Sequence, residues 1–108
     1  MKSLTAVARL AALAQGSRLA IFRALVQAGT GGLCVGDIGA KLKVAPATLS
    51  FHLKELAHAG LTRSRQEGRF IYYAADFKAM NDLLSYLAEN CCGGQSCEVE
   101  SAVCATEQ

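Results

Sequence analysis

The sequence predicts a mainly α-helical domain with one β-hairpin before its last helix. Apolar residues recur at helical spacing through most of the chain, and two short helical segments are separated by only a few residues around position 44. After residue 60 the apolar period changes from helical to alternating, which is typical of a hairpin. The chain has 108 residues, of which 52% are hydrophobic, so one compact domain is expected. We assign that domain to residues 1–92 and expect residues 93–108 to form a flexible tail that contains cysteines.

The first two helices are expected at residues 4–13 and 17–28. The first is rich in Ala and Leu, and its broad apolar face predicts packing on a partner helix as well as on its own core. Ser17 is the expected N-cap of the second helix, and Gly29 is expected to end it. The second helix carries apolar residues at helical spacing, namely Leu19, Phe22, Leu25 and Val26.

Two short helices joined by a tight link are expected next. The first spans residues 35–42, and the second begins at Pro46, because proline is tolerated in the first turn of a helix, and ends at Gly60. The second helix has a buried stripe made of Leu49, Leu53 and Leu56. Its other faces carry smaller or polar residues and one aromatic, namely Ala47, Thr48, Ser50, Phe51 and Lys54. This pattern predicts a helix-turn-helix.

The hairpin is expected to pair residues 61–64 with residues 69–74 across a turn at residues 66–68, with Arg65 and Arg69 beside the turn. This is the kind of hairpin called a wing. The last helix is expected at residues 76–92, with Lys78 and Asp82 as an i,i+4 pair on its outer side. Its apolar seam, which Cys91 continues, consists of Met80, Leu83, Leu84 and Leu87.

Charge is spread unevenly along the chain. Residues 41–69 contain six basic and two acidic residues, a net charge of +4, whereas residues 76–108 contain one basic and six acidic residues, a net charge of −5. The basic segment coincides with the helix-turn-helix and the hairpin, so we expect this segment to meet a polyanion. We find no membrane-spanning stretch and no signal peptide, and we expect a cytoplasmic protein without a membrane partner.

Three of the five cysteines, Cys91, Cys92 and Cys97, lie within seven residues, which suggests one site for a soft, three-coordinate atom. In a cytoplasmic chain, such cysteines favour metal binding or redox chemistry over structural disulfides. Trivalent arsenic and antimony take three thiolates, whereas hard ions and zinc prefer other ligand sets. The side chains of adjacent residues diverge by about 100° on a regular helix. Cys91 and Cys92 can therefore share one atom only if the helix unwinds there, which Gly93-Gly94 permits.

The order of elements and four collinear motifs resemble the ArsR/SmtB family of metal-responsive winged-helix repressors. Together these motifs span residues 17–73: Ser17-Arg18-Leu19-x-Ile21-Phe22-x-x-Leu25, Val35-x-Asp37-Ile38, Ser50-x-His52-Leu53-x-x-Leu56-x-x-Ala59-Gly60-Leu61 and Glu67-Gly68-Arg69-x-x-x-Tyr73. The resemblance implies a homodimer joined through the first and last helices. We assign its contacts to Leu4, Met80, Leu83, Leu84 and Leu87. It also implies a regulator with no catalytic cofactor, not an enzyme.

The resemblance further implies double-stranded operator DNA with an inverted repeat, since the two recognition helices of a dimer enter successive major grooves. The implied DNA contacts are Ala47, Thr48, Ser50, Phe51 and Lys54 of the second short helix, with Arg65 and Arg69 of the wing. The three thiols resemble those of arsenic-responsive members, in which arsenite or antimonite is the effector. Some relatives have Cys-x-Cys near residue 34, but here Cys34-Val35-Gly36 retains only the first cysteine.

Several alternatives remain open at this point. The same thiols suit a winged-helix repressor that senses thiol redox state or another soft metal such as cadmium, lead or copper, and Cys104 is either a fourth ligand or a spare thiol. A thiol-transfer or metal-trafficking protein that binds no DNA is a third class, against which the basic segment argues. Cys34 is expected to be a buried apolar residue. His52 is expected to be a structural, hydrogen-bonding histidine, and His58 to lie on the surface.

Overall fold

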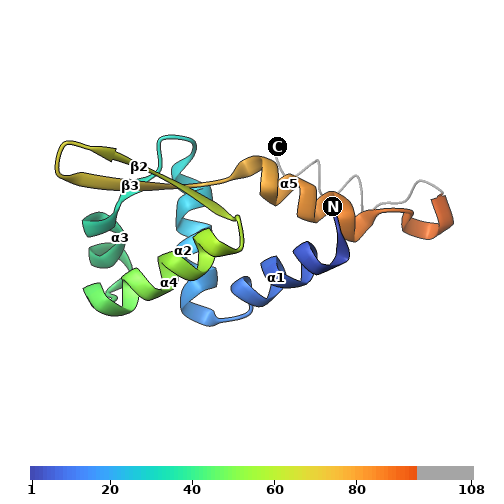
Figure 1. Ribbon diagram of the computed structural model, residues 1–108, viewed down its shortest axis with the longest axis horizontal. Coiled ribbons are helices and arrows are strands. Elements are labelled where there is room, and N and C mark those ends of the chain that lie inside the picture. Colours follow the sequence, from blue (N-terminus) through green and yellow to red (C-terminus); the bar gives the residue numbers. More distant parts are fainter. Residues whose placement is uncertain (95–108) are drawn as a thin grey trace.

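The computed structural model describes residues 1–94 of the chain; residues 95–108, which include Cys97 and Cys104, lie outside the described residues. The predicted mainly α fold with a hairpin wing is confirmed (Figure 1). In chain order, the elements are α1 (Ser3–Leu13), α2 (Gly16–Ala28), β1 (Leu33–Cys34), α3 (Val35–Leu42), α4 (Pro46–His58), β2 (Thr62–Glu67), β3 (Phe70–Ala75), α5 (Phe77–Ala88) and the 3₁₀ turn η1 (Cys91–Gly94). None of the helices in residues 1–94 is long and apolar enough to cross a membrane.

The core lies where α2 meets the two helices of the helix-turn-helix. Ile21 and Leu25 of α2 and Ile38 of α3 are completely buried. On α4 the predicted stripe is confirmed, and its members are the buried residues Leu49, Leu53 and Leu56. Because these side chains form one contiguous cluster, α2, α3 and α4 are held as one packed unit. The opposite face of α4 is left pointing away from the core.

Local chemistry sets the helix ends, in one case differently from the prediction. The expected cap Ser17 is wrong: the side chain of Gln15 accepts a hydrogen bond from the Arg18 amide at 2.8 Å, and α2 begins at Gly16. Gln15 serves one of the first-turn N–H groups that have no partner within the helix, and Ser17 lies inside that turn, not before it. Pro46 opens α4 as predicted, and Lys43 makes the tight link before it in a left-handed conformation, with φ of 57°.

The sheet has three antiparallel strands in the order β1-β3-β2. β1 was not predicted, because two residues cannot show an alternating pattern; Leu33 pairs with Tyr73 and Cys34 with Tyr72. β2 is longer than predicted and reaches Glu67, so the turn consists of Gly68 and Arg69. Its last residues are exposed and polar, so the apolar pattern does not reveal them. Pairing with β3 places them in the strand.

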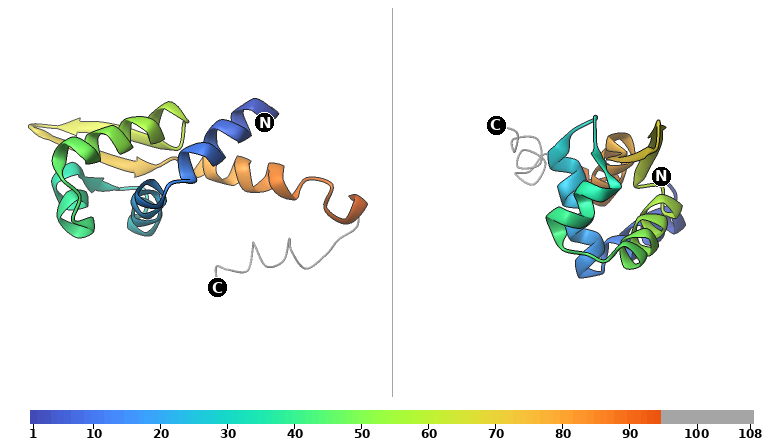
Figure 2. Two further views of the ribbon diagram at one scale, coloured as in Figure 1. Left: turned by 90° about the horizontal axis from the view of Figure 1, so that it is seen from below. Right: turned by 90° about the vertical axis from the view of Figure 1, so that its left-hand side faces the viewer.

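The last helix ends four residues earlier than predicted, at Ala88 and not at Cys92. Glu89 has extended dihedral angles, and Asn90 and Cys92 adopt positive φ values of 56° and 58°. Among the described residues, the end of α5 is weakly packed, since Leu87 is 56% exposed and Glu89 and Asn90 are exposed, and helices with little packing are marginal. α5 therefore projects beside α1 at the end of the molecule opposite the wing, and η1 lies beyond it (Figures 1 and 2).

Asp76 caps α5 and gives a first testable expectation. Its carboxylate accepts a hydrogen bond from the Ala79 amide at 3.0 Å and pairs with Arg63 at 3.3 Å. The Ala79 hydrogen bond, aided by the Arg63 guanidinium, lowers the pKa of Asp76 below its ordinary value. Because the folded-state pKa is the lower one, this stabilisation is present above about pH 4 and is lost as the pH falls further.

We expect Asp76→Ala to lower the free energy of unfolding by about 1 kcal/mol at pH 7, the usual cost of losing an N-cap. The difference from wild type should shrink as the pH is lowered below about 4. Urea unfolding at a series of pH values measures both effects. Asp82→Ala is the matched control, because its ion pair with Lys78 is exposed and should contribute less than about 0.5 kcal/mol. Equal effects of the two substitutions would contradict the capping role.

Candidate functional site

The outward face of α4 carries the side chains that the sequence proposed as DNA contacts. Ala47, Thr48, Ser50, Phe51 and Lys54 are all exposed, opposite the buried leucine stripe. Phe51 is 55% exposed, which is unusual for a large aromatic ring. An exposed helix face of small, hydroxyl, aromatic and basic side chains can enter a major groove, contact thymine methyl groups and bind phosphates.

His52 supports this face from behind. The imidazole is buried, with 7% exposed, and its ring lies 5.6 Å from that of Phe51 at a tilt of 60°. The predicted burial of His52 is therefore confirmed, whereas the predicted hydrogen bonding of its Nδ1 atom is not. Its Nδ1 atom has no hydrogen-bond partner within residues 1–94. The contact gives the exposed Phe51 ring a fixed neighbour, which limits the entropy that ring would lose on binding.

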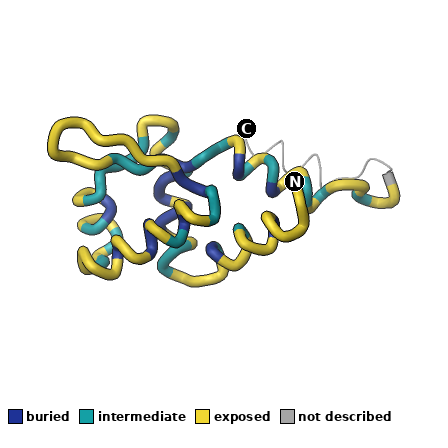
Figure 3. Tube along the Cα trace, viewed as in Figure 1, coloured by how far each residue is buried: buried dark blue, intermediate teal, exposed yellow. Residues whose placement is uncertain are grey.

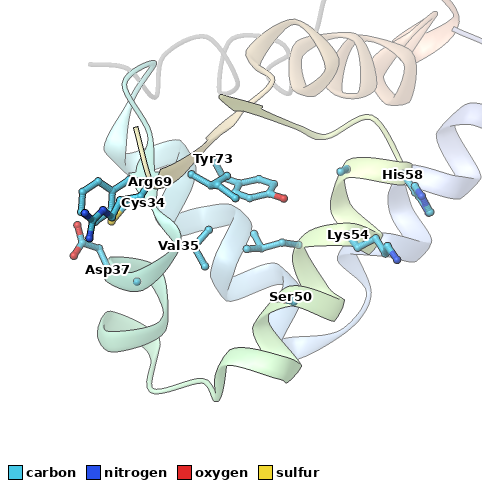
Figure 4. Close-up of a pocket in the computed structure, with 13 residues that line it drawn as sticks. Cys34, Val35, Asp37, Ser50, Lys54, His58, Arg69 and Tyr73 are labelled. Atoms are coloured by element: carbon cyan, nitrogen blue, oxygen red, sulfur yellow. The ribbon is translucent and has the colours of Figure 1, made fainter. Parts of the chain in front are cut away.

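A pocket of about 700 Å³ separates α4 from the wing (Figure 4). Ser50, Lys54 and His58 line it from α4, and Arg69 lines it from the turn of the hairpin. Figure 4 shows Lys54 and His58 on one side and Arg69 on the other. The arrangement places two cations on opposite sides of a concave surface, which suits a phosphate backbone running between the helix and the wing. His58 is exposed as predicted, but its place beside Lys54 in this pocket was not.

The two predicted wing arginines have different surroundings. Arg65 lies within β2. Its guanidinium donates hydrogen bonds to the Glu67 carboxylate at 2.7 Å and to the Gly31 carbonyl oxygen at 2.9 Å, and its Cζ atom lies 4.6 Å from the centroid of the Tyr72 ring. Arg69 is exposed in the turn, and within residues 1–94 no hydrogen bond or ion pair engages it. Arg65 therefore ties the wing to the loop before β1, and Arg69 is the better placed of the two for a polyanion.

Substitution of Lys54 tests whether this surface binds DNA. We expect Lys54→Ala to weaken binding to duplex DNA by about 3–10-fold and to reduce the slope of log affinity against log salt by about 1, as the loss of one phosphate contact requires. The measurement is fluorescence anisotropy at several salt concentrations. Lys78→Ala removes a charge that is also exposed, from α5, and serves as the control. A similar loss in Lys78→Ala would mean that net charge, and not this face, drives binding.

Two of the three proposed effector thiols, those of Cys91 and Cys92, lie beyond the end of α5. The Sγ atoms of Cys91 and Cys92 are 3.5 Å apart, well beyond the roughly 2.05 Å of a disulfide. Because the helix has already ended and Cys92 has a positive φ, the two adjacent side chains converge instead of diverging. No group of three His, Cys, Asp or Glu side chains within residues 1–94 could hold a metal ion. The proposed third ligand, Cys97, lies outside the described residues.

Cys34 lies far from the paired thiols along the fold. It is half-buried at the end of β1, less buried than predicted, and it lines the pocket beside α3. The wing and α3 stand at one end of the molecule, and η1 stands at the other (Figure 1). Within one protomer, Cys34 and the Cys91–Cys92 pair therefore lie in different parts of the fold.

An apolar surface runs along α1 and α5. The proposed dimer contacts fall into two groups, those that are exposed on this surface and those that are buried in their own protomer. Leu4, Leu84 and Leu87 are 83%, 40% and 56% exposed, whereas Leu83 is buried and Met80 packs against the core of its own protomer. Two further exposed residues of α1, Val7 and Leu10, follow Leu4 at a spacing of three and were missed. Figure 3 shows that α1 is exposed along most of its length.

Comparison with known proteins places the chain among transcriptional regulators. A family model described as a helix-turn-helix domain matches residues 13–65. The chain is 34% identical over 88 residues to the transcriptional activator HlyU of Vibrio cholerae, covering 79% of each protein. It is 34% identical over 73 residues to a homologue of the cadmium resistance regulatory protein CadC from Staphylococcus aureus, covering 68% of this chain. The matched segment spans 59% of that relative's length, and 60% and 62% of two Bacillus subtilis regulators.

Solved structures show the same architecture. The homodimeric winged helix-turn-helix domain of Mb0332 from Mycobacterium bovis, described as a possible ArsR-family regulator, superimposes with a TM-score of 0.62 at 33% identity. The match covers 81% of this chain and 82% of that domain. Its likeness therefore extends beyond the helix-turn-helix to most of the described residues.

Proposed function

Because this chain belongs to the ArsR/SmtB family of winged helix-turn-helix transcriptional regulators, we propose that it is a repressor released from its operator by trivalent arsenic or antimony. The family consists of DNA-binding regulators, not enzymes. The observation that carries the proposal is the convergence of the Cys91 and Cys92 thiols at the end of α5, beside the apolar surface that α1 and α5 share.

A homodimer is the first part of the proposal. Leu4, Val7 and Leu10 of α1 and Leu84 and Leu87 of α5 leave an apolar surface that a second copy would cover. The homodimeric state of the related Mb0332 domain supports this assignment. In such a dimer, the two α4 helices would be related by a twofold axis, and an inverted-repeat operator with half-sites about 34 Å apart would match them.

The DNA contacts are the exposed face of α4 and the tip of the wing. Thr48, Ser50 and Phe51 would meet base edges and methyl groups, and Lys54 and Arg69 would meet phosphates on either side of the pocket. Arg65 acts on DNA indirectly, because its bonds to Glu67 and Gly31 hold the hairpin in place.

The choice of trivalent arsenic or antimony as effector rests on the candidate ligands, which are all soft thiol sulfurs. Arsenite reaches the protein as neutral arsenous acid, and three thiols exchange with its three hydroxyl groups, forming three As–S bonds and releasing three waters. Cys91 and Cys92 supply two of the sulfurs from their present separation of 3.5 Å, and Cys97 would supply the third. No histidine lies on α5 or η1, so a borderline metal such as zinc lacks its usual nitrogen ligands.

A second candidate function rests on the same pair of thiols. They also suit a repressor that senses thiol redox state or another soft metal such as cadmium, lead or copper. The likeness to a cadmium resistance regulator favours including cadmium in any test.

The test is a titration of labelled DNA from upstream of the protein's own gene, followed by fluorescence anisotropy at constant salt. Arsenite should weaken binding about 5–150-fold, the usual range of allosteric coupling. Antimonite, cadmium, lead, copper and peroxide are titrated in parallel. Release by cadmium or peroxide but not by arsenite would replace the arsenic assignment with the second candidate. No binding at low salt would reject the DNA-binding proposal itself.

A further inference from the structure

Arg9 of α1 joins two helices that have different tasks in the proposed function. Its Nε atom donates to the carbonyl oxygen of Ala59, the C-cap of α4, at 3.1 Å. Its Nη1 atom donates to the carbonyl oxygen of Ala79 in the first turn of α5 at 3.3 Å. Within residues 1–94 no other side chain hydrogen-bonds to both α4 and α5. One guanidinium therefore fixes the end of the DNA-reading helix relative to the start of the helix that leads to the thiols.

The position of Arg9 suits this connection. α1 packs on both α4 and α5 and runs beneath α5 in the view of Figure 1. The side chain is partly buried, so its two hydrogen bonds are only partly exposed to competition from water. The cation also stands at the C-terminus of α4, where the helix dipole favours positive charge. A planar guanidinium with donors on separate nitrogens can serve two carbonyls at once, which a lysine cannot do in the same geometry.

Gly60 makes room for this side chain. Its φ is 79°, a conformation that favours glycine, and a Cβ atom at this position would stand 3.2 Å from Nη2 of Arg9. Glycine is therefore favoured at position 60 for two reasons: its backbone conformation, and the closeness of the Arg9 guanidinium.

α5 can carry a displacement from the thiols to Arg9. It has 12 residues, so it is about 18 Å long, and a helix of this length moves as a unit. Its first turn is held by Asp76 and by Arg9, and its last turn leads into η1. A tilt or shift of α5 must lengthen the Arg9–Ala79 bond or draw Arg9, and with it the C-cap of α4, along.

We propose that Arg9 is the positioning residue through which a change at the thiol end of α5 reaches the recognition helix α4. This inference rests on the proposed function, and it adds a residue that touches neither DNA nor effector. Because α4 and α5 both hydrogen-bond the Arg9 side chain, a movement of one helix changes the position of the other, and this couples the thiol site to the DNA-binding face.

The experiment compares Arg9→Met with Arg18→Met. Methionine keeps most of the apolar stem and removes every donor. Arg18 is the matched control, because it also donates from a helix to a backbone carbonyl, that of Ala12 at 2.7 Å, and within residues 1–94 it makes no hydrogen bond to α4 or α5. For each protein, the DNA dissociation constant is measured with and without saturating arsenite, and the arsenite dissociation constant is measured with and without DNA.

We expect arsenite to change DNA affinity by the full wild-type ratio in Arg18→Met and by less than about 2-fold in Arg9→Met, against the 5–150-fold typical of coupled sites. Arsenite should still bind Arg9→Met free of DNA with wild-type affinity. By reciprocity, DNA should weaken arsenite binding in the wild type but not in Arg9→Met. A residue that only stabilises the fold would not remove this reciprocal effect while leaving arsenite binding intact.

Two outcomes would overturn the role of Arg9 and leave the proposed function standing. In one, arsenite changes the DNA affinity of Arg9→Met as much as that of the wild type; in the other, Arg18→Met loses the arsenite effect as fully as Arg9→Met does. If arsenite binds the wild type without changing DNA affinity, the proposed function fails and the Arg9 role fails with it. Should Arg9→Met not fold, hydrogen exchange of the wild type decides. Arsenite should then speed exchange of the Gly60 and Leu61 amides, which bond Ala57 and Leu56 at the end of α4, and unchanged exchange would overturn the inference.

Discussion

Cys91→Ser should abolish the release of operator DNA by arsenite. A serine hydroxyl is a poor ligand for a soft atom, so the variant retains at most two of the three proposed sulfurs. We expect arsenite to change the DNA dissociation constant by less than about 2-fold in this variant, compared with about 5–150-fold in the wild type. Fluorescence anisotropy at fixed salt measures both ratios. The affinity of the effector-free variant for DNA should equal that of the wild type, because η1 lies at the far end of the molecule from α4 (Figure 1).

Two companion variants make this experiment specific. Cys92→Ser should behave like Cys91→Ser, because the two sulfurs are neighbours at 3.5 Å. Cys34→Ser should respond as the wild type does, since Cys34 lies beside α3 and the wing pocket. Normal release in Cys91→Ser would show that the effector site lies elsewhere, and loss of release in Cys34→Ser alone would point to the thiol in the wing pocket.

Leu87→Glu should convert the protein to a monomer and cause the largest loss of DNA binding. The side chain is 56% exposed in the protomer, so the protomer itself should tolerate a glutamate there. In the proposed dimer, the substitution would bury an unpaired charge, which costs several kcal/mol. Losing the second subunit removes an avidity gain that typically reaches 10²–10⁴-fold. We therefore expect operator affinity to fall at least about 100-fold, and sedimentation velocity to report the monomer mass.

The control for this substitution is Leu19→Glu. Leu19 is an apolar residue of α2 with a comparable exposure of 44%, and it lies outside the apolar surface of α1 and α5. It should remain a dimer with nearly wild-type affinity. A dimeric Leu87→Glu protein would refute the assignment of the interface to α5, and a monomeric Leu19→Glu protein would move the interface to α2.

Where the sequence-based predictions succeeded, the information was local. The stripe of Leu49, Leu53 and Leu56 has the period of a helix, and Pro46 marks where that helix begins. The predicted DNA-facing residues of α4 are exposed because they occupy the positions that this stripe leaves over. A residue on a helix has its direction set by its neighbours in the sequence, so a periodic pattern predicts faces well.

Where the predictions failed, a partner distant in the sequence was decisive. β1 exists because Leu33 and Cys34 pair with β3, about 40 residues later in the chain, and the last residues of β2 exist as a strand for the same reason. α5 was expected to reach Cys92, but its last turn is largely exposed among residues 1–94, and residues 89–92 leave the helical conformation. The Ser17 cap failed for a local reason: α2 begins at Gly16, so Ser17 lies inside its first turn, and the side chain of Gln15 accepts from the Arg18 amide instead.

The sequence by itself determined the order of the elements, the outward face of α4 and the soft chemistry of the cysteines, but only part of the apolar surface on α1 and α5. Each of these depends on residue type and spacing, which the chain carries without reference to distant contacts. Only the tertiary structure decided that Arg65 holds the wing while Arg69 is left exposed, that Arg9 joins α4 to α5, and that two adjacent thiols converge. The two arginine features depend on where a long side chain comes to rest against residues remote in sequence, and the thiol feature depends on the backbone conformation beyond the end of α5; no spacing rule encodes either.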